Sequence, residues 1–424
     1  MIRSLFALLA LLAQALTLPL AVRAQDEAVL AQRGEDVAAV IRGEKAYGEV
    51  FAPVFINAVP QAQFDALVEQ LRGQLGDFDR LESVAPTGTP GAGTIALRFA
   101  TAIASGPLQL ESAAPYRIAG LRLNAIRPVA AEGETVLDLV TALPGTTSLY
   151  LARLDGSHVL LDHNGDTQLA IGSTFKLYVL STLIQAIARG ERRWDDVVPL
   201  TARSFPSGQM QGWPPGTPVT LQTLATMMVS ISDNTATDQL MHVLGREAVE
   251  AELLASGHAD PDKALPIMST RELFLLKLGA EEQLAQYGAG NQAQRRSILA
   301  AMQQDLLDPA LIQSVFADGP HHIDVEWFAS AQDIAGIYRR LADDPVASAI
   351  LGINPAMDRG QFGQWTFAGY KGGSEPGVLN FSWLLRDPAG APWVLVMTWN
   401  DPAANVSEAR FIGLAQQVLA ETQP

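Results

Sequence analysis

The sequence predicts an α+β protein made of a small domain followed by a larger one. The chain has 424 residues, which is more than one typical domain. Its first part shows a helical pattern followed by strand patterns, whereas its second part begins and ends with strand patterns and is helical between them. Hydrophobic residues make up 48% and charged residues 17%, which is the composition of a compact globular protein.

The first 24 residues have the pattern of a secretory leader. Arg3 precedes a long apolar stretch, which ends at the small-residue exit Val22-Arg23-Ala24. We expect a signal peptide over residues 1–24, cleaved after Ala24, and a mature protein in the bacterial periplasm or outside the cell, away from the membrane. The alternative is a retained membrane anchor, because the apolar stretch approaches the length that spans a bilayer.

Charge and cysteine content exclude several classes of function. The net charge of −16 argues against nucleic acid and anionic membrane surfaces as partners. The chain has no cysteine, so disulfides, thiolate metal sites, cysteine nucleophiles and a lipidated cysteine are excluded. An exported protein without cysteines fits a bacterial periplasm.

Residues 26–126 are expected to form the small α+β domain. Apolar residues at helical spacing predict a helix within 59–76, and residues 94–102 and 116–124 predict strands near the breaker cluster 86–93. This part has no histidine and no glycine loop before a helix, so we predict no chemistry in it. Residues 127–145 are expected to form a linker.

The larger domain, residues 146–424, is expected to contain one sheet that the chain leaves and re-enters. Two apolar runs joined by Asp155-Gly156 predict a hairpin. Helical patterns follow at 172–189, 220–244, 269–278, 291–306 and 329–342. Strand patterns at 365–371, 379–386 and 393–399 precede a last helix at 406–421.

Ser173 and Lys176 stand three residues apart at the start of the apolar helix 172–189. Residues at this spacing share a face of a helix. Burial and the positive end of the helix dipole would lower the pKa of Lys176, so the two can be a nucleophile and its base. The alternative is a helix-capping serine beside a solvated lysine.

Two later motifs supply candidate partners for Ser173. Ser232-Asp233-Asn234 lies between helical segments, and Lys371-Gly372-Gly373 ends a strand where glycines allow close approach of a ligand. Alone, the first could be a helix cap and the second an edge strand that finishes in a turn. Three such motifs in this order, each on the expected kind of element, indicate one site.

The three motifs resemble the S-x-x-K, S-D-N and K-T-G set of the penicillin-recognising serine enzymes, and residues 146–424 resemble a class A β-lactamase domain. The resemblance implies a β-lactamase/transpeptidase-like fold, in which an antiparallel five-stranded sheet is flanked by helices and accompanied by an all-helical subdomain. It implies a monomeric hydrolase that opens a small β-lactam amide through an acyl-Ser173 intermediate and needs no cofactor. The alternatives are an esterase or D,D-peptidase that uses the same site, or a penicillin-binding sensor that becomes acylated and does not turn over.

The resemblance also assigns roles to individual residues. Ser173 would be the nucleophile, and Lys176 would accept or relay its proton. Ser232 would pass a proton towards the leaving nitrogen, while Asn234 would orient the substrate and Lys176. The substrate-binding strand would comprise Lys371, Gly372, Gly373 and Ser374. Lys371 would meet a carboxylate of the substrate, and the backbone N–H groups of Ser173 and Ser374 would form an oxyanion hole.

The chain departs from this family at three places. Between residues 245 and 330, no glutamate is followed three or four positions later by asparagine. Glu272 and Glu326 are the acids nearest in setting, so the release of the acyl group has no assigned base. Gly372 stands where the family has threonine or serine. The long interval from Ser232 to Lys371 predicts an enlarged cover within 255–328.

Two further features of the sequence are the pattern of the small domain and a pair of histidines. The small domain resembles the cone-shaped α+β domains of the nuclear-transport-factor-2 and steroid-isomerase type, and the two-domain layout is similar to β-lactamase-like proteins of clavulanic-acid gene clusters. His321, His322 and Asp324 could bind a metal, but zinc needs three or four converging ligands and no second cluster is visible. We therefore expect a solvated loop there and no metal site.

Overall fold

The structure is a computed structural model that describes residues 20–129, 134–302, 308–317 and 319–422. The chain divides into two compact units, residues 1–134 with 409–414 and residues 135–408 with 415–424. Most of the expected leader lies outside the described residues, and the cleavage expected after Ala24 falls within helix α2 (Leu20–Ile41). In the described part of the chain, no helix combines the length and apolar character needed to cross a membrane.

The first unit has its helices before its sheet, as the sequence predicts. Helices α2, α3 (Tyr47–Val50), α4 (Pro53–Ala58) and α5 (Gln61–Leu75) come first. An antiparallel sheet follows, in which the order of the strands is β1 (Phe78–Pro86), β2 (Ala92–Phe99), β3 (Ala102–Leu110) and β4 (Ile118–Leu121). Strand β5 (Ala125–Pro128) also pairs with β3. The α+β class predicted for this part is confirmed.

An aromatic cluster fills the core of this unit. The ring of Phe51 stacks on that of Phe55 at 4.7 Å and lies 4.6 Å from Tyr47 and 5.3 Å from Phe64. Beside the cluster is a pocket of about 320 Å³, and the described residues around it are apolar except for Gln70 and Arg122. The resemblance of this unit to a particular cone-shaped domain stays a prediction.

The stretch expected to be a linker, 127–145, is partly structured in its described residues. Strand β5 extends to Pro128, and α6 runs over Val136–Thr141. This short helix forms because Thr135 and Asp138 make a capping box, in which Thr135 N donates to Asp138 Oδ2 at 2.8 Å and Asp138 N to Thr135 Oγ1 at 3.3 Å.

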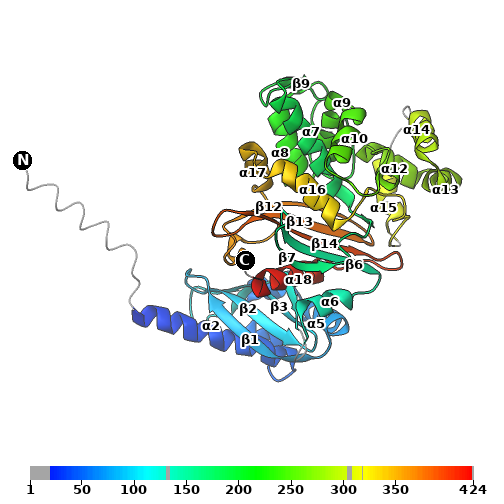
Figure 1. Ribbon diagram of the computed structural model, residues 1–424. Coiled ribbons are helices and arrows are strands. Elements are labelled where there is room, and N and C mark those ends of the chain that lie inside the picture. Colours follow the sequence, from blue (N-terminus) through cyan, green and yellow to red (C-terminus); the bar gives the residue numbers. More distant parts are fainter. Residues whose placement is uncertain (1–19, 130–133, 303–307, 318, 423–424) are drawn as a thin grey trace, which may run out of the picture. The chain divides into compact units, whose positions relative to one another are not determined.

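The second unit is built on a five-stranded antiparallel sheet, as predicted. Its spatial order is β12 (Phe367–Glu375), β13 (Val378–Arg386), β14 (Pro392–Asn400), β6 (Thr146–Arg153) and β7 (Val159–His163). Helix α16 (Ala331–Leu341) packs on β14 and β6, and α7 (Lys176–Ala188) lies beyond it (Figure 1). Because helices cover the sheet, β13 is buried along nearly its whole length.

Helices between β8 and β11 form much of this unit. They include the 3₁₀ helix η1 (Gly172–Phe175), α8 (Leu221–Ser230), α9 (Asn234–Leu244) and α10 (Arg246–Ala255). The predicted helix 220–244 is therefore two helices, which are interrupted at 231–233. The short strands β8 (Leu169–Ala170) and β11 (Phe328–Ala329) pair with each other.

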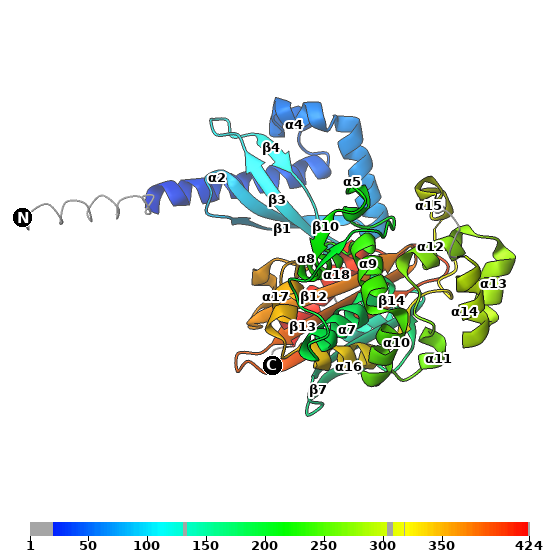
Figure 2. The same ribbon diagram turned by 90° about the horizontal axis from the view of Figure 1, so that it is seen from above.

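The long interval 255–328 consists mainly of short helices. They are α11 (Pro261–Ala264), α12 (Thr270–Leu278), α13 (Glu281–Ala289), α14 (Gln292–Ala301) and α15 (Pro309–Val315). Figure 2 shows α13 and α14 on the far side of α12 from the sheet. The chain continues through α16 and α17 (Pro345–Leu351) to the sheet and closes with α18 (Glu408–Glu421).

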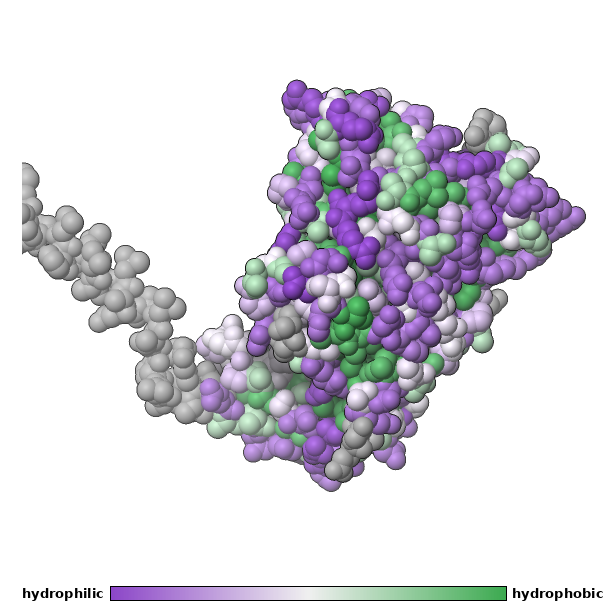
Figure 3. Space-filling model, in the orientation of Figure 1, coloured by the Kyte–Doolittle hydropathy of each residue, from purple (hydrophilic) through white to green (hydrophobic). Residues whose placement is uncertain are grey.

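Polar side chains cover most of the face seen in Figure 3, with small apolar areas between them.

Candidate active site

A pocket of about 360 Å³ in the second unit collects the predicted site residues. Its walls come from η1, the turn between α8 and α9, strand β12, and two segments of the long interval at 273–274 and 326–327. Lys176 lies just outside this wall and contacts it through hydrogen bonds. The predicted residues that line the pocket are Ser173, Ser232, Asn234, Lys371, Gly372, Gly373 and Ser374.

Ser173 lies inside η1 and caps no helix. The N-cap of η1 is Ile171 and that of α7 is Phe175, and neither makes a side-chain cap. Within the described part of the chain, no hydrogen bond involves the half-buried Ser173 hydroxyl, which lies at the pocket wall. The capping interpretation of Ser173 is therefore wrong, and its Oγ remains available to a bound molecule.

Two glycines let the backbone of η1 lie directly against β12. A Cβ on Gly373 would come within 2.4 Å of Ser173 N and 2.1 Å of Ile171 O. A Cβ on Gly172, whose φ is +49°, would lie 3.0 Å from Ser374 N. Larger residues would separate the two segments, so glycine at both positions holds Ser173 beside Ser374.

Lys176 is fully buried and has an unusual set of partners for a cation. Its Nζ donates to Ser232 O at 2.7 Å, Ser232 Oγ at 3.0 Å and Asn234 Oδ1 at 2.7 Å. Burial, followed by the charge of Lys371, holds the pKa of Lys176 well below its usual range, although Asp238 acts in the opposite direction. The interpretation of Lys176 as a solvated residue is wrong, and its amine is suited to accept a proton.

Ser232 adopts a strained backbone conformation between α8 and α9. Its φ of +57° lies in the left-handed region, which costs a non-glycine residue on the order of 1 to 3 kcal/mol. In this conformation Ser232 Oγ accepts from both Lys176 Nζ at 3.0 Å and Lys371 Nζ at 3.2 Å. The strain therefore places one hydroxyl between two lysines.

Asp233 is the N-cap of α9 and fixes this turn. Its Oδ1 accepts from Ala236 N at 2.9 Å, and its Oδ2 accepts from Gln209 N at 2.6 Å and Met210 N at 2.9 Å. The cap and the candidate site thus coexist, because the capping residue holds the two site residues on either side of it.

Lys371 projects from β12 into the same group of side chains and is buried. Burial lowers the pKa of Lys371 to about 7. Its Nζ donates to Ser232 Oγ and to Gly372 O, and its carbonyl accepts from Ser382 Oγ at 2.6 Å. Below about pH 7 it places a positive charge at the pocket.

A buried cluster of Lys277, Glu326 and Glu375 contributes its two glutamates to the pocket wall. Lys277 Nζ lies 2.5 Å from Glu375 Oε1 and 3.3 Å from Glu326 Oε1, and the three side chains are 0%, 8% and 1% exposed. Burial and the charge of Glu326 raise the pKa of Glu375 well above its usual range, although Lys277 acts against this, and a hydrogen bond joins the two carboxyl groups. Burial alone would lower the pKa of Lys277, but the two carboxyl groups raise it.

The sequence identified only one member of this cluster. Glu326 was one of two acids considered for acyl release, whereas Lys277 and Glu375 were missed. The available signal was alternation, since Glu375 follows Lys371 and Gly373 at every second position of β12 and so shares their face. The other acid, Glu272, closes the capping box of α12 and pairs with Arg246 at 2.5 Å, and it is not among the residues that line the pocket.

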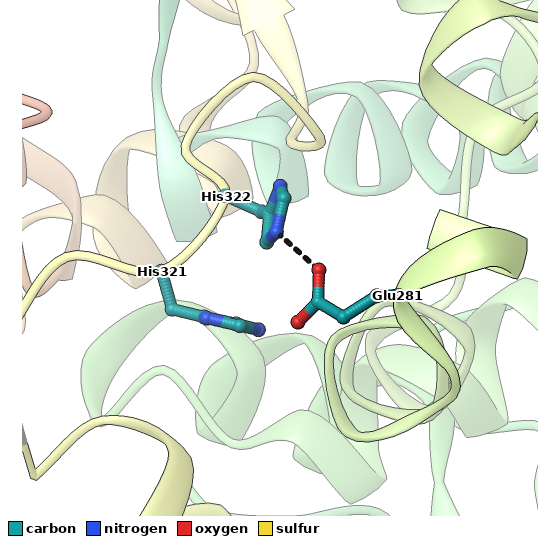
Figure 4. Close-up of side chains that lie close together, drawn as sticks. All are labelled: Glu281, His321 and His322. Atoms are coloured by element: carbon teal, nitrogen blue, oxygen red, sulfur yellow. Dashed lines mark hydrogen bonds and ion pairs between the residues drawn. The ribbon is translucent and has the colours of Figure 1, made fainter. Parts of the chain in front are cut away.

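In the structure, Glu281 lies beside the two histidines of the expected loop. Figure 4 shows Glu281 beside His321 and His322, with one possible ligand atom of each residue within 4.8 Å of the others. His322 Nε2 lies 2.9 Å from Glu281 Oε2, and His322 Nδ1 lies 3.4 Å from Asp324 Oδ1. His321 Nε2 is 3.1 Å from a backbone carbonyl of α12. The sequence alone does not associate Glu281 with His321, because 40 residues separate them along the chain.

Comparison with known proteins points to the same part of the chain. Residues 133–322 match the family model described as the beta-lactamase enzyme family. The match covers a little under half of the chain; it includes Ser173, Lys176, Ser232 and Asn234 and ends before Lys371. No curated protein matches the chain.

Solved structures of low identity are similar to about two thirds of the chain. A beta-lactamase from Sphaerobacter thermophilus is 22% identical over 68% of this chain and 97% of that chain, with a TM-score of 0.46. One from Francisella tularensis is 13% identical over 68% and 96%, with a TM-score of 0.48. One from Burkholderia vietnamiensis is 16% identical over 69% and 96%, with a TM-score of 0.47. At these values the similarities carry no argument about activity.

Proposed function

We propose that this chain is an exported, β-lactamase-like serine hydrolase that works through an acyl-Ser173 intermediate. The observation that carries the proposal is the environment of Lys176. Among the residues that the structure describes, no carboxylate forms an ion pair with this buried lysine, which is hydrogen-bonded to Ser232 and Asn234. A lysine in this setting, three residues from a serine at a pocket, has the features of a proton acceptor for a nucleophile. The family match over 133–322 supports this proposal.

In the acylation step, Ser173 Oγ attacks the carbonyl carbon of a bound amide and its proton passes to Lys176. The backbone N–H groups of Ser173 and Ser374 stabilise the oxyanion, and one such donor is typically worth about 3 to 4 kcal/mol. Ser232, which contacts both lysines, then delivers a proton to the leaving nitrogen as the C–N bond breaks.

The substrate in this proposal is a small β-lactam that carries a carboxylate. Lys371 supplies a positive charge at the end of the pocket formed by β12, and a pocket of about 360 Å³ suits a small molecule. A periplasmic or secreted location follows from the leader pattern in residues 1–24. In this proposal the protein acts as a monomer.

The test uses the mature chain with a chromogenic cephalosporin and with p-nitrophenyl acetate. We expect colour release from the cephalosporin and a transient mass adduct on Ser173 by intact-mass spectrometry. Ser173→Ala should abolish both, whereas Ser157→Ala, in the exposed turn between β6 and β7, should change neither.

Each outcome points to one alternative. Turnover of the ester alone would indicate an esterase. A stable adduct without turnover would indicate a penicillin-binding sensor. Absence of any adduct on Ser173 with both reagents would refute the nucleophile assignment.

A further inference from the structure

We infer that Glu326 is the general base that releases the acyl group from Ser173, with Glu375 and Lys277 as its positioning residues. This inference rests on the proposed function and supplies the step that the sequence left without a base. It follows from where the cluster lies and from how its charges balance.

The cluster is held beside Ser173 from two sides. On one side, Ile171 N donates to Trp327 O at 2.9 Å, and the Trp327 ring stacks on Phe175 at 3.9 Å, so the residue next to Glu326 is fixed to both flanks of Ser173. On the other side, Gly373 lies against Ser173, and Glu375 follows it at the next position on the same face of β12. Glu326, Glu375 and Ser173 all line the one pocket.

The charges of the cluster balance only if it holds one extra proton. Lys277 is a buried cation, and two ionised carboxylates beside it would leave a net buried negative charge, which is costly. A proton on Glu375, shared in its hydrogen bond with Glu326, makes the cluster neutral. The second carboxyl oxygen of Glu326, Oε2, accepts a hydrogen bond from Trp327 N at 3.0 Å, which fixes the orientation of this side chain.

The reaction assigned to this carboxylate balances without any further reagent. Water attacks the carbonyl carbon of the acyl-Ser173 ester while Glu326 takes one of its protons. The tetrahedral intermediate collapses by breaking the bond between that carbon and Ser173 Oγ, and Oγ takes up a proton from the protonated carboxyl. The products are the free acid and the serine hydroxyl, and Glu326 is again ionised.

The decisive experiment separates acylation from release. Wild type, Glu326→Gln, Glu375→Gln and Glu272→Gln are acylated with a chromogenic cephalosporin and freed of excess reagent. The decay of the adduct on Ser173 is then followed by intact-mass spectrometry. Glu272→Gln is the matched control, because Glu272 is a buried glutamate outside the residues that line the pocket, and glutamine can also close its capping box.

We expect Glu326→Gln to acylate normally and to release the adduct at least about 100-fold more slowly, since general-base catalysis contributes roughly 10²- to 10⁴-fold. Glu375→Gln should release within about tenfold of wild type, because a neutral amide can still donate to Glu326 and leaves Lys277 paired. A merely structural role for the cluster would make the two variants equally slow. Glu272→Gln should match wild type.

Other outcomes overturn the inference. If Glu326→Gln releases the adduct at a rate within a few-fold of wild type, the inference is overturned. It is also overturned if the wild-type adduct never decays. In both cases Ser173 remains the nucleophile. If Glu326→Gln does not fold, Glu326→Asp, which preserves the charge balance with Lys277, must release at least about tenfold more slowly, and an unchanged rate would overturn the inference. Absence of any adduct on wild type would remove the proposed function as well.

Discussion

The low pKa of Lys371 predicts that the proposed recognition of anionic substrates depends on pH. Burial lowers this pKa to about 7, so the ammonium is present below pH 7 and is lost as the pH rises through that value. For a pKa of about 7, the charged fraction falls from roughly 90% at pH 6 to roughly 1% at pH 9. We therefore expect recognition of a substrate carboxylate to weaken about 90-fold over this range.

The assay compares two substrates so that other ionisations cancel. The ratio of kcat/KM for a carboxylate-bearing chromogenic cephalosporin to kcat/KM for neutral p-nitrophenyl acetate is measured from pH 6 to pH 9, because kcat/KM reports the free enzyme. The ionisation of Lys176 affects both substrates and drops out of the ratio. The ratio should fall with pH in wild type.

Two variants provide the controls for this prediction. Lys371→Arg keeps its charge throughout the range, so its ratio should stay constant. Lys371→Met has no charge, so its ratio should be low at every pH. A constant ratio in wild type would show that Lys371 does not recognise the carboxylate, and a falling ratio in Lys371→Arg would assign the titration to another group.

Two stability predictions follow from contacts near the site and in the core. Gly208→Ala should lower the free energy of unfolding by about 1 to 3 kcal/mol, because φ is +107° and a Cβ would come within 2.3 Å of the Asp233 carboxyl. Gly212→Ala is the control in denaturant unfolding and should change this free energy little, since its Cβ would have no atom within 4 Å. Arg340→Ala should cost about 3 kcal/mol, since it leaves the buried Glu252 carboxylate without its two-point partner, and a loss below about 1 kcal/mol in the same assay would contradict this.

The sequence predicted the elements and the three motifs, because both depend on local pattern. Alternating and helical periodicity located the strands of the larger sheet and most of its helices to within a few residues. Apolar periodicity alone runs through 220–244 without showing the break, but the interpretation of Ser232-Asp233-Asn234 as a boundary between helical segments is confirmed, because Asp233 is the N-cap of α9. The small helix α6 was also missed, although its capping box Thr135–Asp138 was legible in the sequence.

The Lys277–Glu326–Glu375 cluster could not be predicted in the same way. Its members are separated by 49 residues between Lys277 and Glu326 and by 98 between Lys277 and Glu375, and each lies in an ordinary local context. Only the fold shows that all three are buried together. Alternation along β12 places Glu375 on the face of Lys371, but no local pattern brings Lys277 and Glu326 to that face, because their pairing depends on tertiary contact.

The position of β12 at one edge of the sheet has a consequence for the behaviour of the protein in solution. An edge strand presents backbone groups that a second chain can pair with, and such pairing leads to aggregation. Here the turn at Gly172 and Ser173 lies against Gly373 and Ser374 and obstructs that edge. A substitution that pushed the turn away would therefore harm solubility, so the close packing of Gly172 and Ser173 against β12 also protects the molecule from self-association.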